Sequence, residues 1–434
     1  MNSTETILII GAGTFGVSTA YHLAQSLPNP SRITLLDRSP PPSPAAASTD
    51  INKIIRADYP NPLYTQLGLE AIAAWKTLPC LRSTNPSPYH QTGWIAMEEK
   101  DSDLRHRIRQ NFHTCHHEPV IQDLSEPEVR TRWGGVLDET DFAPFGGYSF
   151  NPSVGWADAG QALEAMANEA VGLGVKYEVG EVVRLVHAGG RVRGVQMVDG
   201  RVVEAEKVLL ATGAWTSSLM AGLEEELGME MDGDERVEGQ VEAAGVCVAH
   251  FRLGEEERKV YGGLPVVVYG GEGEIIPPTA DGILKFTFAT SFKNTIQTAS
   301  GHSISVPSAE DQFHVPLGLQ NDCLAGVRRR LPRLLDGGRQ PDYYRLCWDS
   351  ISPDQQPLIT RHPHEQLENL YLAVGGSFHC YKFLPIIGKY VVNVLSGVGN
   401  GREKDEAWGW KSTEENQGGV HEKLVPTREL RDFL

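Results

Sequence analysis

The chain is poor in cysteine and in positive charge. Its 434 residues include only 6 cysteines, scattered without a CxxC pair, so we expect neither a disulfide framework nor a cysteine-rich zinc site, and a reduced, intracellular protein is predicted. Lys and Arg number 39 against 56 Asp and Glu, which gives a net charge of −17. This excess of negative charge argues against nucleic acid or an anionic membrane as a partner.

Long apolar stretches are also absent. No run reaches the roughly 20 residues of a membrane-spanning helix, and the first residues lead into an apolar strand without the basic segment of a signal peptide. Residues 431–434 are not a peroxisomal Ser-Lys-Leu signal, so we expect a cytoplasmic protein with no membrane partner. His113, Cys115, His116 and His117 lie close together, but their spacing fits no standard zinc site and no metal is predicted.

The most informative pattern is a glycine-rich turn, Gly-Ala-Gly-Thr-Phe-Gly at 11–16, which joins an apolar strand to an amphipathic helix. Gly11 permits the turn, Gly13 lets the backbone approach a pyrophosphate, and Gly16 allows close packing of helix on strand. A second apolar run ends at Asp37, where an acidic side chain can accept the ribose hydroxyls. The pattern predicts a dinucleotide site and argues against NADP, but it leaves NAD and FAD open.

Further along the chain, apolar periodicity predicts helices at 62–78 and 159–173 and a short basic helix at 328–335. The acidic, glycine-rich stretch 223–239 has no apolar period and is predicted to be an exposed excursion. The polar tail from 402 is expected to be loosely attached. Signatures of one nucleotide-binding domain return in the middle and near the end of the chain, which is not how a simple two-half NAD dehydrogenase is organised.

Five stretches carry the residues of chemical interest. They are the glycine turn with Asp37, residues 48–59 (STDINKIIRADY), residues 180–182 with 211–215 (GEV and ATGAW), residues 282–286 (GILKF), and residues 344–359 with 370–385 (YRLCWDSISPDQQPLI and LYLAVGGSFHCYKFLP). In this order they resemble flavin-dependent amine oxidases of the D-amino-acid-oxidase superfamily. The resemblance is closest to monomeric sarcosine oxidase, fructosyl amino acid oxidase (amadoriase) and saccharopine oxidase, and it covers nearly the whole chain.

The resemblance implies an α/β fold with two unequal parts. One is a Rossmann-like FAD-binding domain that is discontinuous in sequence, and the other is an α+β substrate domain built on a mixed or antiparallel sheet. The expected boundaries are 1–88, 150–222 and 344–401 for the FAD-binding domain, 89–149 and 223–343 for the substrate domain, and 402–434 for a polar C-terminal tail.

The resemblance also implies which residues bind FAD. They are Gly11, Gly13, Thr14, Phe15, Gly16, Asp37, Arg38, Ser48, Thr49, Asn52, Lys53, Val182, Gly213, Cys347, Gly376, Ser377, Phe378 and Lys382. In the family, the cysteine at the position of Cys347 carries the flavin through an 8α-thioether, so a covalent cofactor is expected. Residues 370–385 resemble the C-terminal flavin loop of the family, from which they depart by bulky residues at 378–381, among which His379 is expected to pack rather than to reach the substrate.

Four residues receive catalytic roles from the same resemblance. Arg56 and Lys382 would bind the substrate carboxylate, a task to which the planar guanidinium of arginine is well suited. Tyr59 would line the substrate pocket. Lys285 would lie over the flavin and help O2 to accept electrons, because a cation stabilises the negative charge that develops there.

These roles predict an FAD-dependent oxidase that acts on the C–N bond of secondary-amine α-amino acids, N-alkyl or cyclic, and yields an imine and hydrogen peroxide. The partners would be a small amino-acid substrate and O2, and a monomer is expected. The alternatives are a flavin-dependent amine dehydrogenase with another electron acceptor, a biosynthetic imine-forming oxidase of a specialised pathway, an NAD-linked dehydrogenase, and a non-catalytic flavoprotein. The identity of the amine stays open, since many N-substituted amino acids fit one carboxylate clamp.

Overall fold

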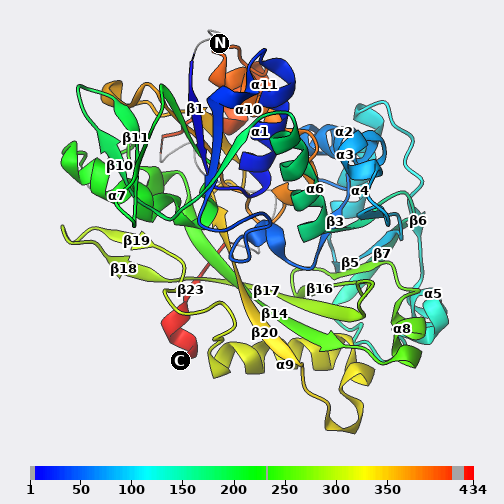
Figure 1. Cartoon of the computed structure of the whole chain (residues 1–434). Helices are drawn as coiled ribbons and strands as arrows, with labels where there is room; N and C mark the ends of the chain where they lie inside the picture. The colour runs from blue at the N-terminus through cyan, green and yellow to red at the C-terminus, as the bar shows by residue number, and fades with distance from the viewer. Residues whose placement is uncertain (1–4, 231–232, 413–424) are drawn as a thin grey trace.

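The computed structural model describes residues 5–230, 233–412 and 425–434 and contains two large β-sheets with helices packed over each (Figure 1). The first sheet has six strands in the order β21-β22-β13-β1-β2-β9, and every neighbouring pair is parallel except β21 with β22. Its strands are β1 (Ile7–Ile10), β2 (Ile33–Asp37), β9 (Lys176–Val179), β13 (Lys207–Leu210), β21 (Leu358–Arg361) and β22 (Leu370–Val374).

Both faces of this sheet are buried, as is usual for parallel strands. Ile7 and Ile9 of β1 belong to one apolar core and Leu8 and Ile10 to another, because successive side chains of a strand point to opposite faces. The first core is completed by α1 (Thr14–Ser26), α6 (Ala159–Gly172) and α10 (Ile387–Leu395). The second is completed by α7 (Thr216–Glu226) and an antiparallel sheet of β10 (Val182–His187), β11 (Val192–Met197) and β12 (Val202–Glu204).

The second sheet has nine strands, eight of them in the order β20-β14-β17-β16-β15-β5-β7-β6, with β23 beside β17. The strands are β5 (Trp94–Glu99), β6 (Gln122–Asp123), β7 (Phe145–Asn151), β14 (Glu242–Arg252), β15 (Val266–Tyr269), β16 (Gly273–Ile276), β17 (Ile283–Lys293), β20 (Tyr343–Ile351) and β23 (Arg428–Glu429). Pairs β5–β15 and β17–β23 are parallel and the others antiparallel, so this is the predicted mixed sheet. The predicted fold class is therefore confirmed.

Helix α9 (Leu317–Arg330) packs on one face of the second sheet, which leaves the other face toward the first sheet (Figure 1). The remaining helices are α2 (Pro62–Thr77), α3 (Pro79–Arg82), α4 (Leu104–Thr114), α5 (Glu126–Thr131), α8 (Glu255–Tyr261) and α11 (Arg402–Trp408). The remaining strands are β3 (Asn52–Ile55), β4 (Tyr89–His90), β8 (Gly155–Asp158), β18 (Thr295–Gln297) and β19 (Ser303–Ser305). Of the helices formed by these described ranges, none is long and apolar enough to cross a bilayer.

The predicted domain boundaries remain a proposal. Residues 344–401 are predicted to belong to the FAD-binding part, yet β20 pairs with β14 inside the second sheet. Strand β22, from the same stretch, pairs with β13 of the first sheet. The segment therefore crosses from one sheet to the other, and it carries side chains into the space between them.

The helices predicted at 62–78 and 159–173 are confirmed as α2 and α6. The basic helix expected at 328–335 is wrong in both bounds, because the helix present there is α9, which ends at Arg330. A 3-10 turn begins at Pro332, where the proline ring and its missing N–H prevent continuation of the α-helix. The basic residues thus form the last turn of a longer, half-buried helix.

The expectation of a loosely attached tail from 402 is wrong for its described parts. Trp408 in α11 is 1% exposed, and its Nε1 donates to the Tyr64 hydroxyl at 3.3 Å. Phe433 is also buried. Two large aromatic anchors outweigh the polar composition of the surrounding chain. Residues 413–424 lie outside the described part.

The expectation of an exposed excursion at 223–239 is wrong for part of the stretch. Residues 226, 228, 230, 234, 235 and 239 are exposed, but residues 223, 224, 229, 236 and 237 are buried, and residues 231–232 lie outside the described part. The side chain of Glu224 is 0% exposed and that of Arg236 is 3% exposed, and the two are 3.8 Å apart. Glu238 lies 3.6 Å from the same guanidinium. Glu224 and Arg236 are buried against each other, so the lack of apolar periodicity does not indicate exposure at these two positions.

This cluster should make stability depend on pH. Burial and the neighbouring charge of Glu238 raise the pKa of Glu224 to about 8. A raised carboxyl pKa contributes stability below the unfolded value of about 4.3, and that contribution is lost as pH rises through 8. We expect Glu224→Gln to match the wild-type melting temperature at pH 5 and to exceed it by about 2 °C or more at pH 9.

Thermal unfolding from pH 5 to 9 measures this difference. The matched control is Glu225→Gln, the adjacent carboxylate on α7, which is partly exposed and has its pKa lowered by hydrogen bonds to Ser300 and Thr298. Identical pH profiles for Glu224→Gln and the wild type would show that Glu224 does not carry the effect.

Candidate active site

A cavity of about 860 Å³ is lined by residues from both large sheets. It receives the carboxyl end of β1 and the N-terminus of α1 from the first sheet, and side chains of β5, β14, β16, β17 and β20 from the second. In open α/β sheets, ligands bind beyond the carboxyl ends of the parallel strands. The volume is in the range of natural cofactor and ligand pockets.

The glycine turn forms one end of the cavity. Gly11 has φ +100°, and a Cβ on it would lie 2.4 Å from the Ala211 carbonyl oxygen. Gly13 precedes the first residue of α1 and lines the cavity, so the amide groups of the first helical turn meet the cavity without a side chain in between. The nearby Ser48 hydroxyl is buried without a hydrogen-bond partner in the described structure. Amides at a helix N-terminus and a spare hydroxyl fit a pyrophosphate.

Asp37 lies at the same end, where its Oδ2 accepts a hydrogen bond from the Ala12 amide at 2.8 Å. Gly16 has a different task and does not line the cavity. A Cβ on Gly16 would lie 1.8 Å from the Gly11 carbonyl oxygen, so this glycine allows the helix to start close against the turn. The three glycines therefore occupy the positions that a dinucleotide turn requires.

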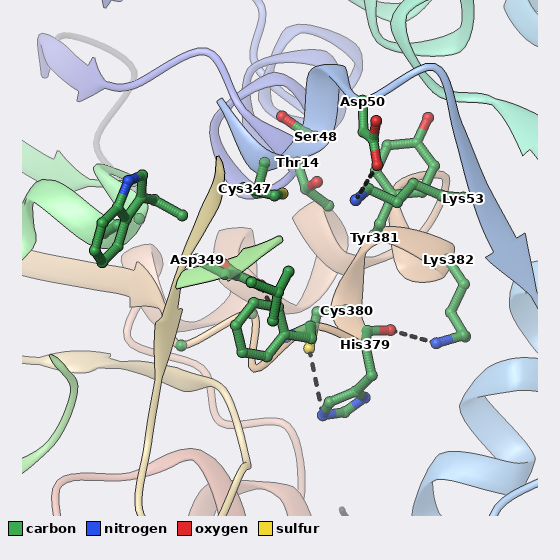
Figure 2. Close-up of a pocket in the computed structure, with 18 of the residues that line it drawn as sticks. Thr14, Ser48, Asp50, Lys53, Cys347, Asp349, His379, Cys380, Tyr381 and Lys382 are labelled. Carbon is green, nitrogen blue, oxygen red and sulfur yellow. Dashed lines mark hydrogen bonds and ion pairs between the residues drawn. The ribbon is translucent and has the colours of Figure 1, made fainter. Parts of the chain in front are cut away.

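The wall formed by the second sheet follows the two-residue period of its strands. Cys347 and Asp349 of β20 line the cavity, while Leu346 and Trp348 belong to the apolar core on the other face. The same alternation places further side chains in the cavity wall: Val246 and Val248 of β14, Glu274 of β16, and Thr287 and Ala289 of β17. Figure 2 shows Cys347 and Asp349 pointing into this space.

The charge at the centre of this wall is the carboxylate of Asp50, which is 1% exposed. Its Oδ2 accepts from the Lys285 ammonium at 2.5 Å and lies 3.4 Å from the ammonium of Lys53 (Figure 2 shows the latter pair). Its Oδ1 lies 3.4 Å from the guanidinium of Arg345 and 3.9 Å from Nε2 of His250. One carboxylate therefore holds three cationic side chains and an imidazole together.

The pKa shifts follow from this arrangement. Burial alone would raise the pKa of Asp50, but Lys285, Lys53 and the other donors hold it well below its usual range. Burial lowers the pKa of Lys285 despite the neighbouring carboxylate. Burial would likewise lower the pKa of Lys53, but Cys347 and Asp50 raise it. Asp50 is thus ionised at neutral pH.

Two cations lie on the other side of the cavity. The Arg56 guanidinium is 4.3 Å from the centre of the Tyr59 ring and 4.6 Å from the Trp94 ring, and these contacts restrain its plane. Lys382 is 4% exposed and donates to the His379 carbonyl oxygen at 2.5 Å, as Figure 2 shows. Burial and the charge of Arg56 lower the pKa of Lys382 well below its usual range. Two basic side chains in one cavity favour an anionic ligand group, because an anion beside Lys382 would stabilise its protonated form.

His379 lines the cavity but is held by protein groups on both ring nitrogens. Nε2 lies 2.8 Å from the Gln355 carbonyl oxygen, which can only accept, so Nε2 carries the proton and Nδ1 accepts from the Tyr59 hydroxyl at 3.1 Å. Burial and Lys382 lower the pKa of His379 to about 3, so the ring is neutral. The structure thus places His379 as a packed, hydrogen-bonded support at the cavity wall.

The structure brings most predicted residues to one cavity. Those that line it are Gly11, Gly13, Thr14, Phe15, Asp37, Arg38, Ser48, Lys53, Arg56, Val182, Gly213, Cys347, Gly376, Phe378 and Lys382. Those that lie behind its surface are Gly16, Thr49, Asn52, Tyr59, Lys285 and Ser377. Lys285 is the notable case, because its ammonium is turned to Asp50 and to the Asn52 carbonyl oxygen, at 2.7 Å.

Sequence reasoning missed several residues of the cavity. Asp50 lies inside the stretch 48–59, where no role was given to it. Asp349 accepts a hydrogen bond from the Phe378 amide at 2.8 Å and so restrains the loop that follows β22. Glu274 lines the cavity from β16. The two-residue period of each strand indicates which face Asp349 and Glu274 share with their neighbours. The register between strands, which brings these faces to the cavity, cannot be read from one sequence.

Comparison with known proteins agrees with this geometry. The profile of the family described as FAD dependent oxidoreductase matches residues 6–394. The chain is similar to L-saccharopine oxidase of Schizosaccharomyces pombe, with 27% identity over 94% of this chain and 93% of that protein. It is also similar to human peroxisomal sarcosine oxidase, with 25% identity over 88% of this chain and 90% of that protein. The crystal structure of Amadoriase II from Aspergillus fumigatus matches with a TM-score of 0.77 and 29% identity, over 97% and 95% of the two chains.

The chain therefore belongs to the family of FAD-dependent oxidoreductases. The predicted resemblance and the predicted enzyme class are confirmed, and FAD is the cofactor of this family. The features that fit FAD in this structure are the bare helix N-terminus at Gly13, the spare hydroxyl of Ser48 and the elongated cavity that continues to Cys347 and Lys382. Covalent attachment stays a prediction.

Removal of the central carboxylate should be costly for stability. We expect Asp50→Asn to lose about 3–5 kcal/mol of unfolding free energy, because it leaves buried cations without their counter-charge. Denaturant unfolding measures this loss. Asp199→Asn is the control, since Asp199 pairs with Arg201 at the surface and should lose under about 1 kcal/mol. A similar, small loss for both variants would contradict the central role of Asp50.

Proposed function

We propose that the protein oxidises the C–N bond of secondary-amine α-amino acids with O2, and yields an imine and hydrogen peroxide. The observation that carries this proposal is the pair of buried cations, Arg56 and Lys382, in the cavity that begins at the glycine turn. An α-carboxylate is the anion that suits this pair. Two similar proteins bear the names of oxidases of L-saccharopine and sarcosine, and both compounds are secondary-amine amino acids.

The cofactor, when bound, supplies the two-electron oxidation and returns the electrons to O2. The residues of the chain position the substrate. A guanidinium restrained between the rings of Tyr59 and Trp94 can bind a carboxylate through two parallel hydrogen bonds, and the Lys382 ammonium adds a second charge. The positive potential of both groups also favours loss of the proton from the substrate amine, which has to be neutral to react. Orientation of the reacting carbon then provides much of the rate.

We further propose that Cys347 carries the flavin covalently. The thiol is 3% exposed and lines the cavity, and Lys53 brings positive charge to it. The thiolate is the nucleophilic form of cysteine. Figure 2 shows Cys347 and Lys53 on the same side of the space.

Acid denaturation tests this attachment. The wild-type protein should keep its flavin after precipitation, and Cys347→Ser should release it entirely. Cys380→Ser, which alters another thiol of the cavity wall, should keep the flavin bound. Release of flavin from the denatured wild type would disprove the covalent link.

The activity itself is tested by anaerobic titration of the purified protein with N-alkyl and cyclic amino acids, followed through the visible flavin band. At least one of these amines should bleach the band, and readmission of air should produce one peroxide per amine oxidised. Bleaching without peroxide would favour the dehydrogenase that uses another acceptor. A band that no amine bleaches would contradict the proposal.

Lys285 is proposed to assist the oxygen-dependent step, from its position behind Lys53 with Asp50 between them. Lys285→Met should lower the rate constant for reaction with O2 by about 100-fold and change the amine-dependent rate constant much less. Stopped-flow absorbance separates the two steps. Lys293→Met, which removes a half-exposed lysine from the same strand, is the control. Equal slowing of both steps would rule out the proposed role.

A further inference from the structure

The β2–β3 loop (residues 38–51) forms one side of the dinucleotide end of the cavity. Ser43 and residues 45–48 of this loop line the cavity. The loop lies against the glycine turn, because a Cβ on Gly13 would be only 3.3 Å from the Ser48 hydroxyl. A dinucleotide bound at the glycine turn would therefore also meet the β2–β3 loop.

This loop is poorly equipped to fix its own position. Residues 40, 41, 42 and 44 are prolines, which have no backbone N–H group to donate. Its backbone hydrogen bonds connect near neighbours, such as Ala46 N–H with the Ser43 carbonyl oxygen at 3.2 Å and Thr49 N–H with the Ala46 carbonyl oxygen at 3.1 Å. The place of the loop in the cavity wall therefore depends on donors from other parts of the chain.

Arg345 of β20 is such a donor. Its side chain is 6% exposed, and Nη2 donates to the carbonyl oxygens of Pro44 at 3.1 Å and of Ala46 at 3.2 Å. Its Nη1 lies 3.4 Å from Oδ1 of Asp50. One guanidinium from the second sheet therefore binds the β2–β3 loop at three points between residues 44 and 50.

Gln312 completes this contact from a third segment of the chain. Its Oε1 accepts from Nε of Arg345 at 3.1 Å, and its Nε2 donates to the Pro44 carbonyl oxygen at 2.9 Å. Its own carbonyl oxygen accepts from the Leu346 amide at 2.7 Å, which attaches Gln312 to β20. All three nitrogens of the guanidinium thus have partners in a fixed plane, an arrangement that a lysine cannot reproduce.

The same strand also carries a residue of the cavity wall. Arg345 and Cys347 are two residues apart on β20, so their side chains project from the same face of the second sheet. Ala47 of the β2–β3 loop packs against the apolar cluster that contains Cys347. The bonds of Arg345 therefore fix the loop relative to the wall that the second sheet contributes to the cavity.

We propose that Arg345 is a positioning residue for the cofactor, and that it holds the β2–β3 loop closed against the dinucleotide without touching it. Arg345 lies behind the residues that line the cavity, so its effect passes through Ser48 and the neighbouring loop residues. A loop that is already ordered loses less conformational entropy when the ligand binds, which favours retention of the cofactor. This inference concerns FAD binding and does not depend on which amine, if any, the protein oxidises.

The test measures FAD binding to the full-length Cys347→Ser protein, in which a covalent link cannot hide dissociation. Adding Arg345→Lys keeps a positive charge near Asp50 but removes the fork that reaches two carbonyl groups. The dissociation constant for FAD, measured by flavin fluorescence, should rise at least about tenfold, mainly through faster release. Gln312→Ala, which leaves the ion pairs of Asp50 in place, should raise it about threefold, and it carries the test if Arg345→Lys does not fold.

Arg339→Lys in the same background is the matched control. Arg339 also belongs to the second-sheet side of the chain, and its guanidinium pairs with Glu257 and donates to the Arg252 carbonyl oxygen at 2.6 Å, away from the cavity. This variant should bind FAD as the Cys347→Ser protein does. Thermal unfolding of the proteins without FAD shows whether the two arginine variants lose comparable stability.

ADP separates a role at the dinucleotide end from a general disturbance of the cavity. It contains a pyrophosphate but no flavin, so calorimetry should show its affinity falling in Arg345→Lys by a factor similar to that for FAD. Unchanged affinities for both ligands, or a loss for FAD alone, would overturn the inference. An equal loss of FAD affinity in Arg339→Lys would overturn it as well. In each of these cases the oxidase proposal stands, since bleaching of the flavin band by amines tests it separately.

Discussion

The ionised carboxylate of Asp50 is the interaction on which the cavity wall depends. It lies in the loop before β3, and strands β3, β17 and β20 each contribute a cation to it. Without this carboxylate, the three cations would repel one another in a region of low dielectric constant. Held by one counter-charge, they give this wall a net positive charge without exposing it to water. The segment 48–59, the sheet and the cavity are in this way joined by charge as well as by apolar packing.

Much of the first sheet could be predicted from the sequence, because its signals are local. The apolar run at 7–10, the three glycines and Asp37 follow one another within a short stretch, and each has its own steric or hydrogen-bonding reason. The second sheet, which supplies the other wall of the cavity, is different. Its strands come from separate parts of the chain, and its pairing of β14 with both β17 and β20 depends on contacts between distant residues. Periodicity shows that Cys347 and Asp349 share a face, but not that this face meets the glycine turn.

Two of the errors made from sequence have one physical origin, because polar composition predicts exposure at 223–239 and in the tail, whereas Glu224, Arg236 and Trp408 are buried. Glu224 and Arg236 lie against each other in the folded structure, and a polar segment can be fastened by one aromatic side chain. For Lys285, the sequence identifies the residue but not its partner. The resemblance pointed to the residue, but the side chain's choice of Asp50 as partner is a property of the folded wall.

The buried Trp408 is connected by contacts to residues of the cavity wall, outside its own helix. Its indole donates to Tyr64, and the Tyr64 ring meets the His379 ring edge-on at 5.2 Å between centres. His379 in turn supports the carbonyl group that receives Lys382. The segment from 402, where the family resemblance fades, therefore packs behind the loop that carries His379 and Lys382. Substitutions in that segment can change the shape of the cavity without changing a residue that lines it. Proteins with similar cavity-lining residues can in this way come to accept different amines.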